Sequence, residues 1–300
     1  MDRRFQHDAF FYLDERGFVS GLVPFILDGL ANDEPVLVAV DAPKIDLLRG
    51  ELDGAADRVG FVDMRRLGRN PALIIPAWQE FLSGRPDDTD VRGVGEPIWP
   101  GCNGPELVET QYHESLLNLA FGDAHGFRLV CPYDAGRLER SILAGAECSH
   151  TNSDRYCGLD GVAATFSSPL PDPPADALSF SLWGSRLADL RKIVFAQATG
   201  AGLSQLRAAE LVLAVNEVVT NSLRHGGGHG TLSIWREQDR VIHEVCDRGR
   251  ITSPLAGRRK PSLDGEGGRG LWLANQVCDL VQIRSSAAGS SVRLHMRLIQ

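Results

Sequence analysis

Apolar and polar residues follow two alternating patterns along the first half of the chain. Short apolar runs rich in β-branched residues predict buried strands, and apolar residues spaced three to four positions apart predict helices. The predicted helices cover residues 21–34, 44–56, 71–84 and 106–121, and the predicted strands cover 35–40, 59–64, 91–99 and 127–134. This alternation is typical of a largely parallel sheet flanked by helices.

A proline-rich stretch ends this pattern. The sequence SSPLPDPPAD (167–176) holds four prolines in six positions, which remove backbone donors and disfavour both helix and central strand. We therefore expect a linker at 167–177 between a first domain at 1–166 and a second at 178–300. A chain of 300 residues suits roughly two domains, each large enough for its own core.

The second half has a different order of elements. Helices are predicted at 185–202, at 205–225 with Ser204 as the cap, and at 270–278, and strands at 231–237, 241–247, 279–285 and 291–299. Strands that follow one another closely can pair as antiparallel hairpins, whereas a wound parallel sheet needs crossovers between its strands. The second domain is therefore expected to be an α/β sandwich.

One predicted helix carries polar residues at regular intervals. In LVLAVNEVVTNSLRHGGG (211–228), Glu217, Asn221 and His225 recur every four positions. Because a helix advances about 100° per residue, the three side chains share one stripe and can act on one ligand. Any one of them alone is more typical of the wet face of an amphipathic helix. Their interpretation depends on the motifs that follow.

The chemistry of these side chains suits a nucleotide with a bound magnesium ion. The amide oxygen of Asn221 is a neutral, hard ligand that can hold Mg²⁺ beside phosphate oxygens. Glu217 can act as the catalytic base by accepting a proton from an attacking hydroxyl or water. His225 can donate to a phosphate oxygen.

Two further motifs complete a candidate nucleotide site. Asp247 ends a predicted strand, where its carboxylate can accept the exocyclic amine of adenine, and Gly249 lets the backbone approach the ring. The motif GEGGRG precedes an apolar helix, so bare amides and a helix N-terminus can face a phosphate chain. The phosphate-binding residues predicted in this motif are Gly265, Gly267, Gly268, Arg269 and Gly270.

The order of these motifs matches a known superfamily. The blocks are NEVVTNSLRHG (216–226), DRG (247–249), GEGGRG (265–270) and GSSVRL (289–294). They resemble the nucleotide-binding boxes of the GHKL superfamily, and most closely those of the anti-sigma-factor serine kinases, over residues 178–300. The resemblance implies a Bergerat α/β sandwich that binds ATP with Mg²⁺. The family usually has D-x-G-x-G at the second block, and Arg250 is expected to stand in place of its second glycine, with Ile251 after it.

The first half resembles a sensory domain. Its motifs are HDAFFYLDERGFVSGLVPFILDGL (7–30), GRNPALIIP (68–76), GEPIWPG (95–101), QYHESLLNLAF (111–121) and CPYD (131–134). Together they resemble the MEDS sensory domain over residues 7–151, which implies a RecA-like parallel-sheet α/β fold without a phosphate loop. Ligands tend to bind at strand ends in such sheets. A sensory pocket for an unknown small molecule is therefore predicted at Glu96, Trp99, His113, Glu114, Asn118 and Tyr133.

The two resemblances imply a regulatory function with three alternatives. In the first, the chain is an ATP-dependent anti-sigma regulator that phosphorylates a serine of an anti-anti-sigma partner and sequesters a sigma factor. In the second, it is a sensor histidine kinase with His113 as phosphoacceptor, although Asn118 stands where that box has proline. In the third, it is a nonenzymatic, ligand-controlled anti-sigma module. The resemblance also implies a homodimer.

Charge and composition limit the cellular location and the kinds of partner that we expect for this protein. Residues 1–175 hold 15 basic against 28 acidic residues, and 176–300 hold 16 against 11, so the second half suits an anionic ligand. No nucleic-acid-binding motif, membrane-length apolar run or secretory signal is evident, so we expect a cytoplasmic protein without direct nucleic-acid contact. The six cysteines are expected to be reduced thiols. Cys148, His150 and Cys157 match no common zinc spacing.

Overall fold

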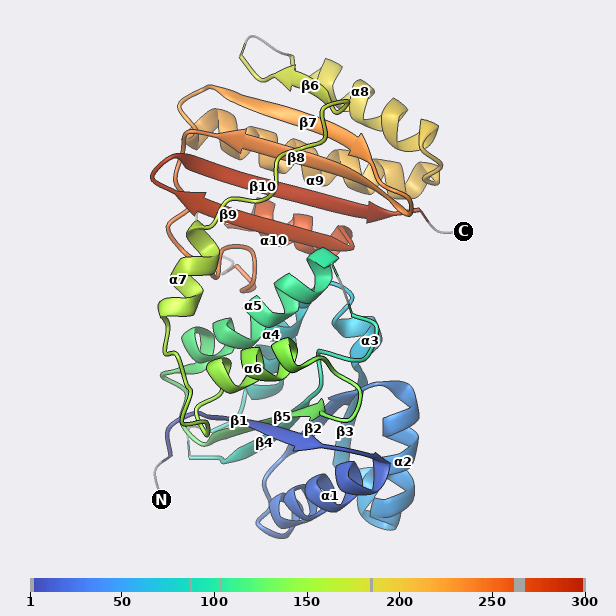
Figure 1. Cartoon of the computed structure of the whole chain (residues 1–300), viewed down its shortest axis with the longest axis vertical. Coiled ribbons are helices and arrows are strands. Elements are labelled where there is room, and N and C mark those ends of the chain that lie inside the picture. The colour runs from blue at the N-terminus through green and yellow to red at the C-terminus, as the bar shows by residue number, and fades with distance from the viewer. Residues whose placement is uncertain (1–2, 87, 103, 184–185, 262–267, 299–300) are drawn as a thin grey trace. The chain divides into compact units, whose positions relative to one another are not determined.

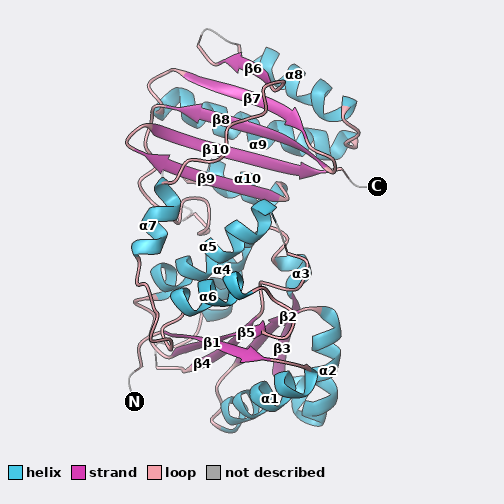
Figure 2. Cartoon of the chain, in the orientation of Figure 1, coloured by secondary structure: helices cyan, strands magenta, loops and turns pink. Residues whose placement is uncertain are grey.

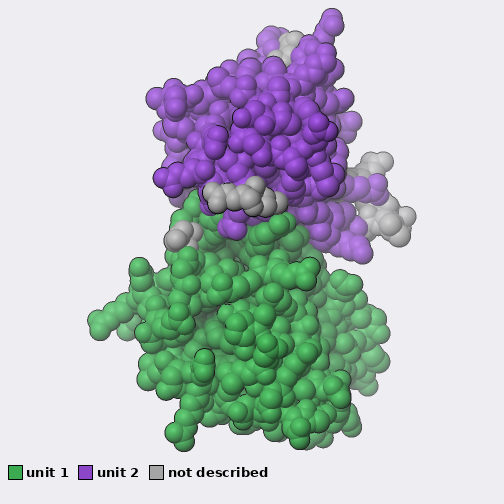
Figure 3. Space-filling view, turned by 90° about the vertical axis from the view of Figure 1, so that its right-hand side faces the viewer, with its two compact units in different colours: residues 1–161 green, residues 162–300 purple. Residues whose placement is uncertain are grey.

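The computed structural model describes residues 3–86, 88–102, 104–183, 186–261 and 268–298. The chain forms two compact units, residues 1–161 and 162–300, which Figure 3 colours separately. Each unit has its own five-stranded sheet. The two units are described one at a time below.

The first unit is built on a parallel sheet with the strand order β1-β5-β4-β2-β3 (Figure 1). Its strands are β1 (Gln6–Tyr12), β2 (Val36–Val40), β3 (Val59–Asp63), β4 (Val91–Gly95) and β5 (Phe127–Asp134). Its helices are α1 (Glu15–Ala31), α2 (Ala42–Leu52), η1 (Asp53–Arg58), α3 (Met64–Leu67), η2 (Pro71–Leu73), α4 (Ile74–Leu82), α5 (Gly104–Phe121) and α6 (Arg140–Ser149). The predicted alternation of helix and strand, and the parallel sheet, are confirmed.

The strands β2 and β4 lie inside the sheet and are buried along most of their length. Four of the five residues of β2 and all five of β4 are buried, as expected for strands covered on both faces. The edge strand β1 is different, because its buried and partly exposed positions alternate irregularly. The hydrophobic pattern did not predict this strand, and its pairing with β5 fixes where its side chains point.

The start of α1 was predicted too late. The helix begins at Glu15 and not near residue 21, because the side chain of Asp14 accepts a hydrogen bond from Gly17 N at 2.7 Å and caps it. Pro24 lies inside the helix.

The second unit has an antiparallel sheet with helices on one face (Figure 2). In the order β6-β7-β8-β10-β9, the strands are β6 (Leu178–Ser181), β7 (Gly230–Arg236), β8 (Arg240–Asp247), β10 (Gly289–Arg297) and β9 (Leu280–Ser286). The helices are α8 (Leu187–Gly200), α9 (Gln205–His225) and α10 (Arg269–Val277), and α7 (Asp160–Ser167) spans the division between the units. This arrangement is the predicted α/β sandwich, with β6 as an unpredicted edge strand.

The helix α9 is the central helix of the second unit. Ser204 caps it as predicted, because its Oγ accepts a hydrogen bond from Arg207 N at 3.2 Å. The buried residues of α9 pack towards β7, β8, β10 and the two neighbouring helices. They are Ala208, Leu211, Ala214, Val215, Val218, Val219 and Ser222. This apolar face leaves Glu217 and Asn221 half-buried and His225 exposed.

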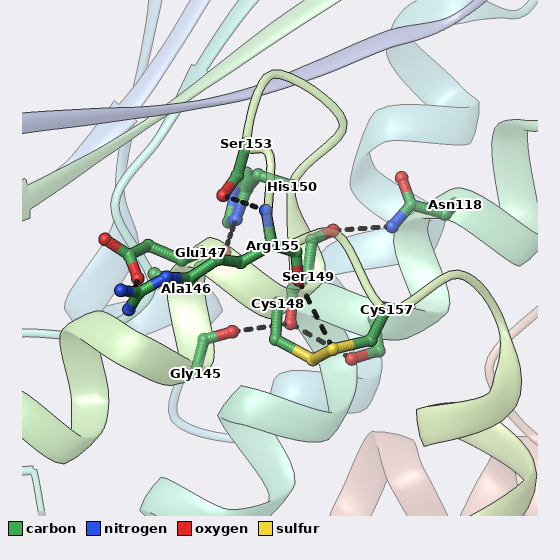
Figure 4. Close-up of a disulfide and its surroundings, with 11 residues drawn as sticks. Asn118, Gly145, Ala146, Glu147, Cys148, Ser149, His150, Ser153, Arg155 and Cys157 are labelled. Carbon is green, nitrogen blue, oxygen red and sulfur yellow. Dashed lines mark hydrogen bonds and ion pairs between the residues drawn. A yellow bond between two sulfur atoms is a disulfide. The ribbon is translucent and has the colours of Figure 1, made fainter.

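Two of the six cysteines are joined, which corrects the expectation of reduced thiols. Cys148 and Cys157 form a disulfide that closes a short loop after α6 (Figure 4). Cys157 N also donates to Cys148 O at 2.9 Å, so the backbone holds the two ends of this loop together. The remaining free cysteines are Cys102, Cys131, Cys246 and Cys278. Among the described residues, no helix combines the length and apolarity that a membrane crossing needs.

The stability of the second unit should depend on His243 below neutral pH. This β8 residue is fully buried, neither ring nitrogen has a hydrogen-bond partner, and burial lowers its pKa from 6.5 to about 3. The unfolded chain therefore binds one more proton than the folded chain between those two pH values. The free energy of unfolding should fall by up to about 1.4 kcal/mol per pH unit as the pH drops from 6.5 towards 3.

Denaturant titrations of the wild type and of His243→Leu at pH 7, 6 and 5 measure this contribution. The groups other than His243 titrate in both proteins, so only the difference between the two pH slopes belongs to His243. Equal slopes would show that the imidazole is not held neutral in the fold.

Candidate nucleotide-binding site

The polar stripe of α9 lies against the start of α10. A Cβ atom placed on Gly270 would lie 3.0 Å from Asn221 Nδ2 and 3.0 Å from Glu217 Oε2. A larger residue would therefore press on both side chains, and the glycine lets the N-terminal turn of α10 approach them. The structure thus brings together the first and third motifs, which are some fifty positions apart in the sequence.

The N-terminal end of α10 presents groups that can bind an anion. Gly268 is its N-cap with a φ of 76°, which a glycine adopts without strain. Gly268 and Arg269 are exposed, so the first amides of the helix and a guanidinium stand at one surface. The other two predicted phosphate-binding glycines, Gly265 and Gly267, lie outside the described residues.

The second motif lies at the opposite end of the α9 stripe. Asp247 is the last residue of β8, and its Oδ1 accepts a hydrogen bond from Gly249 N at 2.7 Å. A Cβ on Gly226 would be 2.5 Å from Asp247 Cγ, and one on Gly249 would be 2.6 Å from His225 O. Two glycines therefore allow the Asp247 turn to pack against the C-terminal end of α9. Both Asp247 and Gly249 are half-buried.

The fourth motif holds the turn that follows Asp247. Ser290 Oγ donates to Gly249 O at 2.9 Å and accepts from Ile251 N at 3.2 Å. Ser285 Oγ accepts from the same amide of Ile251 at 2.9 Å. These two serines of β9 and β10 give the turn a fixed shape without a second glycine.

The departure from D-x-G-x-G is therefore tolerated by the backbone. Counted from Asp247, the second glycine of that pattern falls on Ile251 and not on Arg250, so the expected replacement by Arg250 was wrong. Neither residue has a positive φ, so neither position requires glycine in this structure. The unusual motif does not distort the turn that carries Gly249.

A cavity of ≈ 340 Å³ borders Asp247 on its other side. It is lined by Ser181, His229, Gly230, Thr231, Cys246, Asp247 and Arg248. Glu217 and Asn221 do not line it. Glu217 and Asn221 therefore face the α9–α10 contact, and Asp247 is the predicted site residue that lines this cavity.

The residues of the predicted sensory pocket fall into separate places in the first unit. Tyr133 OH donates to Glu114 Oε2 at 2.7 Å, and His113 Nε2 lies 4.0 Å from Glu114 Oε1. Asn118 Oδ1 lies 3.1 Å from His7 Nδ1 in the same region. These side chains form a buried polar cluster and not an open pocket, since Tyr133, Glu114 and His113 are at most 1% exposed.

Glu96 and Trp99 make other contacts. Glu96 accepts hydrogen bonds from Tyr12 OH and from Lys44 Nζ, each at 2.6 Å, and burial raises its pKa despite the Lys44 charge. Trp99 lies beneath the guanidinium of Arg65, 5.4 Å from the ring centre. Glu96 follows the carboxyl end of β4, where the sequence placed a ligand site.

A larger cavity lies at the other end of the same sheet. Its volume is ≈ 780 Å³, and it is lined by residues at the amino ends of the strands, among them Gln6, Arg92 and Arg128. Arg92 is buried and paired with Asp28 and Glu34 at its rim. None of the six predicted pocket residues lines this cavity.

The folds and motifs define a two-domain α/β protein, and family comparisons give each domain its class. Residues 6–151 match the MEDS family, described as the MEthanogen/methylotroph, DcmR Sensory domain. Residues 184–296 match the histidine kinase-like ATPase domain. The chain therefore carries a MEDS domain followed by a histidine kinase-like ATPase domain, which confirms the resemblance of the first half to MEDS and that of the second half to a GHKL-type ATPase domain. An ATPase domain of this class implies that the second unit binds ATP.

One solved structure shows weak similarity to this chain. The crystal structure of the RsbU and RsbW domains of Rv1364c from Mycobacterium tuberculosis is 20% identical, with a TM-score of 0.31. The match covers 41% of this chain and 33% of that chain, so it spans about a third of that protein's length. No curated protein sequence matches this chain. The assignment of the second unit to the ATPase class therefore depends on its family match and on the arrangement of its site residues.

Proposed function

We propose that this chain is an ATP-dependent serine/threonine kinase and anti-sigma regulator under the control of its MEDS domain. The observation that carries the proposal is the convergence on α9 of Glu217, Asn221, the N-terminus of α10 and the Asp247 turn. Together these groups provide what transfer of a phosphoryl group from ATP uses: a base, a metal ligand, an anion-binding helix end and an acceptor for the adenine amine. They come from three separated motifs.

The residues fit ATP and Mg²⁺ by their chemistry and by the space around them. The Asn221 amide oxygen would hold Mg²⁺, which neutralises phosphate charge when bound. The amides at Gly268–Gly270, with Arg269, would bind the phosphates, and Asp247 would accept the adenine amine. The small Gly270 leaves room at the α9–α10 contact, where a side chain would crowd the metal ligand.

Within this site, Glu217 would take the proton of the acceptor serine. It lies one helical turn from Asn221 on the same stripe, so the hydroxyl it activates would meet the terminal phosphate beside the magnesium ligand. The transferred group is the terminal phosphoryl of ATP, and ADP is the second product. His225 is exposed at the end of the stripe, where it can donate to a phosphate oxygen.

The proposed partners are proteins. An anti-anti-sigma protein would supply the serine, and a sigma factor would be sequestered by the same unit, so that phosphorylating the first partner favours binding of the second. We further propose a cytoplasmic protein that acts as a homodimer, without direct nucleic-acid contact. The MEDS domain would sense an unknown small molecule.

The structure favours this proposal over a sensor histidine kinase. A phosphoacceptor histidine must reach the terminal phosphate of ATP, but His113 is 0% exposed and lies on α5 among buried residues of the first unit. No such observation among the described residues argues against a nonenzymatic anti-sigma module, which would bind ATP without transferring phosphate. A phosphotransfer assay separates these functions.

Incubation of the full chain with ATP labelled at the terminal phosphate, Mg²⁺ and candidate anti-anti-sigma proteins tests the proposal. We expect acid-stable label on a serine of the partner, because a phosphate ester of serine survives acid. Acid-labile label on the chain itself would indicate a histidine kinase. Binding of ATP and of a sigma factor with no labelled partner would reduce the protein to a nonenzymatic module.

A further inference from the structure

Four metal-ligating groups meet in the core of the first unit. They are His7 on β1, Glu114 on α5, Cys131 on β5 and His150 directly after α6. Each offers one ligand atom, and the four atoms lie within 4.8 Å of one another. All four residues are at most 1% exposed. They are far apart in the sequence, so only the fold brings them together.

Three of the distances inside this cluster are close to those of a tetrahedral ligand shell. Cys131 Sγ lies 3.3 Å from His7 Nε2, and Glu114 Oε2 lies 3.8 Å from the same nitrogen. His150 Nε2 lies 3.1 Å from Glu114 Oε2. Metal–ligand bonds of zinc sites place neighbouring ligand atoms about 3.3 to 3.8 Å apart. An ion at the centre would need only small shifts of these side chains.

Both histidines are oriented for metal ligation. His150 Nδ1 donates to Ala146 O at 2.7 Å, since a carbonyl oxygen can only accept (Figure 4). Asn118 Nδ2 donates to Ser149 O at 2.7 Å, which turns its Oδ1 towards His7, so His7 Nδ1 is the donor across 3.1 Å. The proton of each neutral ring therefore lies on Nδ1, and each Nε2 lone pair points into the cluster. Metal-bound histidines are held by the same kind of outer contact.

The charges of the four side chains match a divalent cation. A divalent ion with one carboxylate, one thiolate and two neutral imidazoles would make the buried cluster electrically neutral. Buried charge is otherwise costly.

We propose that His7, Glu114, Cys131 and His150 form a binding site for a divalent transition metal ion, with Zn²⁺ as the best match. Two imidazole nitrogens, one thiolate and one carboxylate oxygen are ligands that zinc accepts in a tetrahedral site. On binding, the Cys131 thiol loses its proton to solvent and its sulfur bonds to the metal, with no change of oxidation state. Four protein ligands leave no open position, so the site is structural.

The ion would join four elements of the first unit. It would connect the edge strand β1 to β5, to α5 and to the loop after α6. Two features already hold that loop in place: Thr151 N donates to His7 O at 2.8 Å, and the Cys148–Cys157 disulfide closes it around His150. The metal ligands would therefore be positioned before the ion arrives, which favours tight binding.

Metal analysis of the full-length protein, purified without chelators or metal-affinity resin, tests the site. We expect about one zinc ion per chain and, at the zinc absorption edge, one sulfur among four ligands. After metal removal and reloading with Co²⁺, a thiolate-to-cobalt charge-transfer band should appear. Cys131→Ser should remove this band and weaken binding more than the roughly 10- to 100-fold that loss of an outer contact causes.

The matched control is Cys278→Ser, which alters a buried free thiol of the second unit and should leave metal content and the cobalt band unchanged. The absorption edge of the wild type gives the answer even if Cys131→Ser fails to fold. A folded wild type that takes up no Zn²⁺ or Co²⁺ on refolding would overturn the proposal. So would a bound ion with only nitrogen and oxygen ligands, because it would lie elsewhere.

Discussion

Asn221→Ala should abolish the stabilisation of the second unit by Mg-ATP. A ligand that binds only the folded state stabilises it by about 2.7 kcal/mol when its concentration is 100 times its dissociation constant. In the wild type this should appear as a rise in the melting temperature of the second unit. The variant lacks the proposed oxygen ligand for Mg²⁺ and should melt at the same temperature with and without Mg-ATP. Differential scanning calorimetry of the full chain measures both.

Asn216→Ala is the matched control for this experiment. Asn216 lies on the same helix, but its Oδ1 accepts a hydrogen bond from Arg191 Nε at 2.8 Å, towards α8 and away from the α10 contact. This variant should keep the full Mg-ATP response, although its own melting temperature can fall slightly. If Asn221→Ala kept the response, the nucleotide would be held by other residues, and the magnesium role of this amide would be wrong.

The sequence predicted the elements that follow strong local patterns. The periodicity of α9 and the cap at Ser204 gave its bounds, and the apolar runs gave β2 and β5. Two of the four edge strands, β1 and β6, were missed, because their buried and exposed positions do not alternate cleanly. Tertiary pairing, and not local preference, makes residues 6–12 a strand.

The polar stripe of α9 could be predicted because it depends on helix geometry alone. Its neighbours could not, since the contact of Gly270 with Glu217 depends on how α10 packs on α9. The same dependence on tertiary packing explains why the sequence did not predict the cluster of metal-ligating residues in the first unit. Among metal-ligating residue types, the sequence placed only Cys148, His150 and Cys157 close together, and Cys131 was expected to be a free thiol. The fold instead bonds those two cysteines to each other and turns His150 towards Glu114.

Glu217→Gln should separate nucleotide binding from phosphoryl transfer. The amide has the same shape as the carboxylate but is a poor proton acceptor, so the serine hydroxyl would lose its base. General base catalysis contributes about 10²- to 10⁴-fold, and kcat for phosphorylation of the partner should fall by that factor. The Mg-ATP response in calorimetry should remain, because Asn221, Asp247 and the α10 N-terminus are unchanged. Initial rates of label transfer to the partner measure the loss.

Glu210→Gln is the matched control for this variant. Glu210 lies on the same helix, two turns before Glu217. Glu210 is paired with Arg207 at 2.7 Å and lies outside the proposed site, so its loss should alter stability and leave kcat unchanged. A kcat that is unaffected by Glu217→Gln would mean that the serine loses its proton without help from this carboxylate. Since the transition state of phosphoryl transfer is loose and needs mainly charge neutralisation, the site would then act by positioning alone. In that case Asn221 and the α10 N-terminus would carry the catalysis.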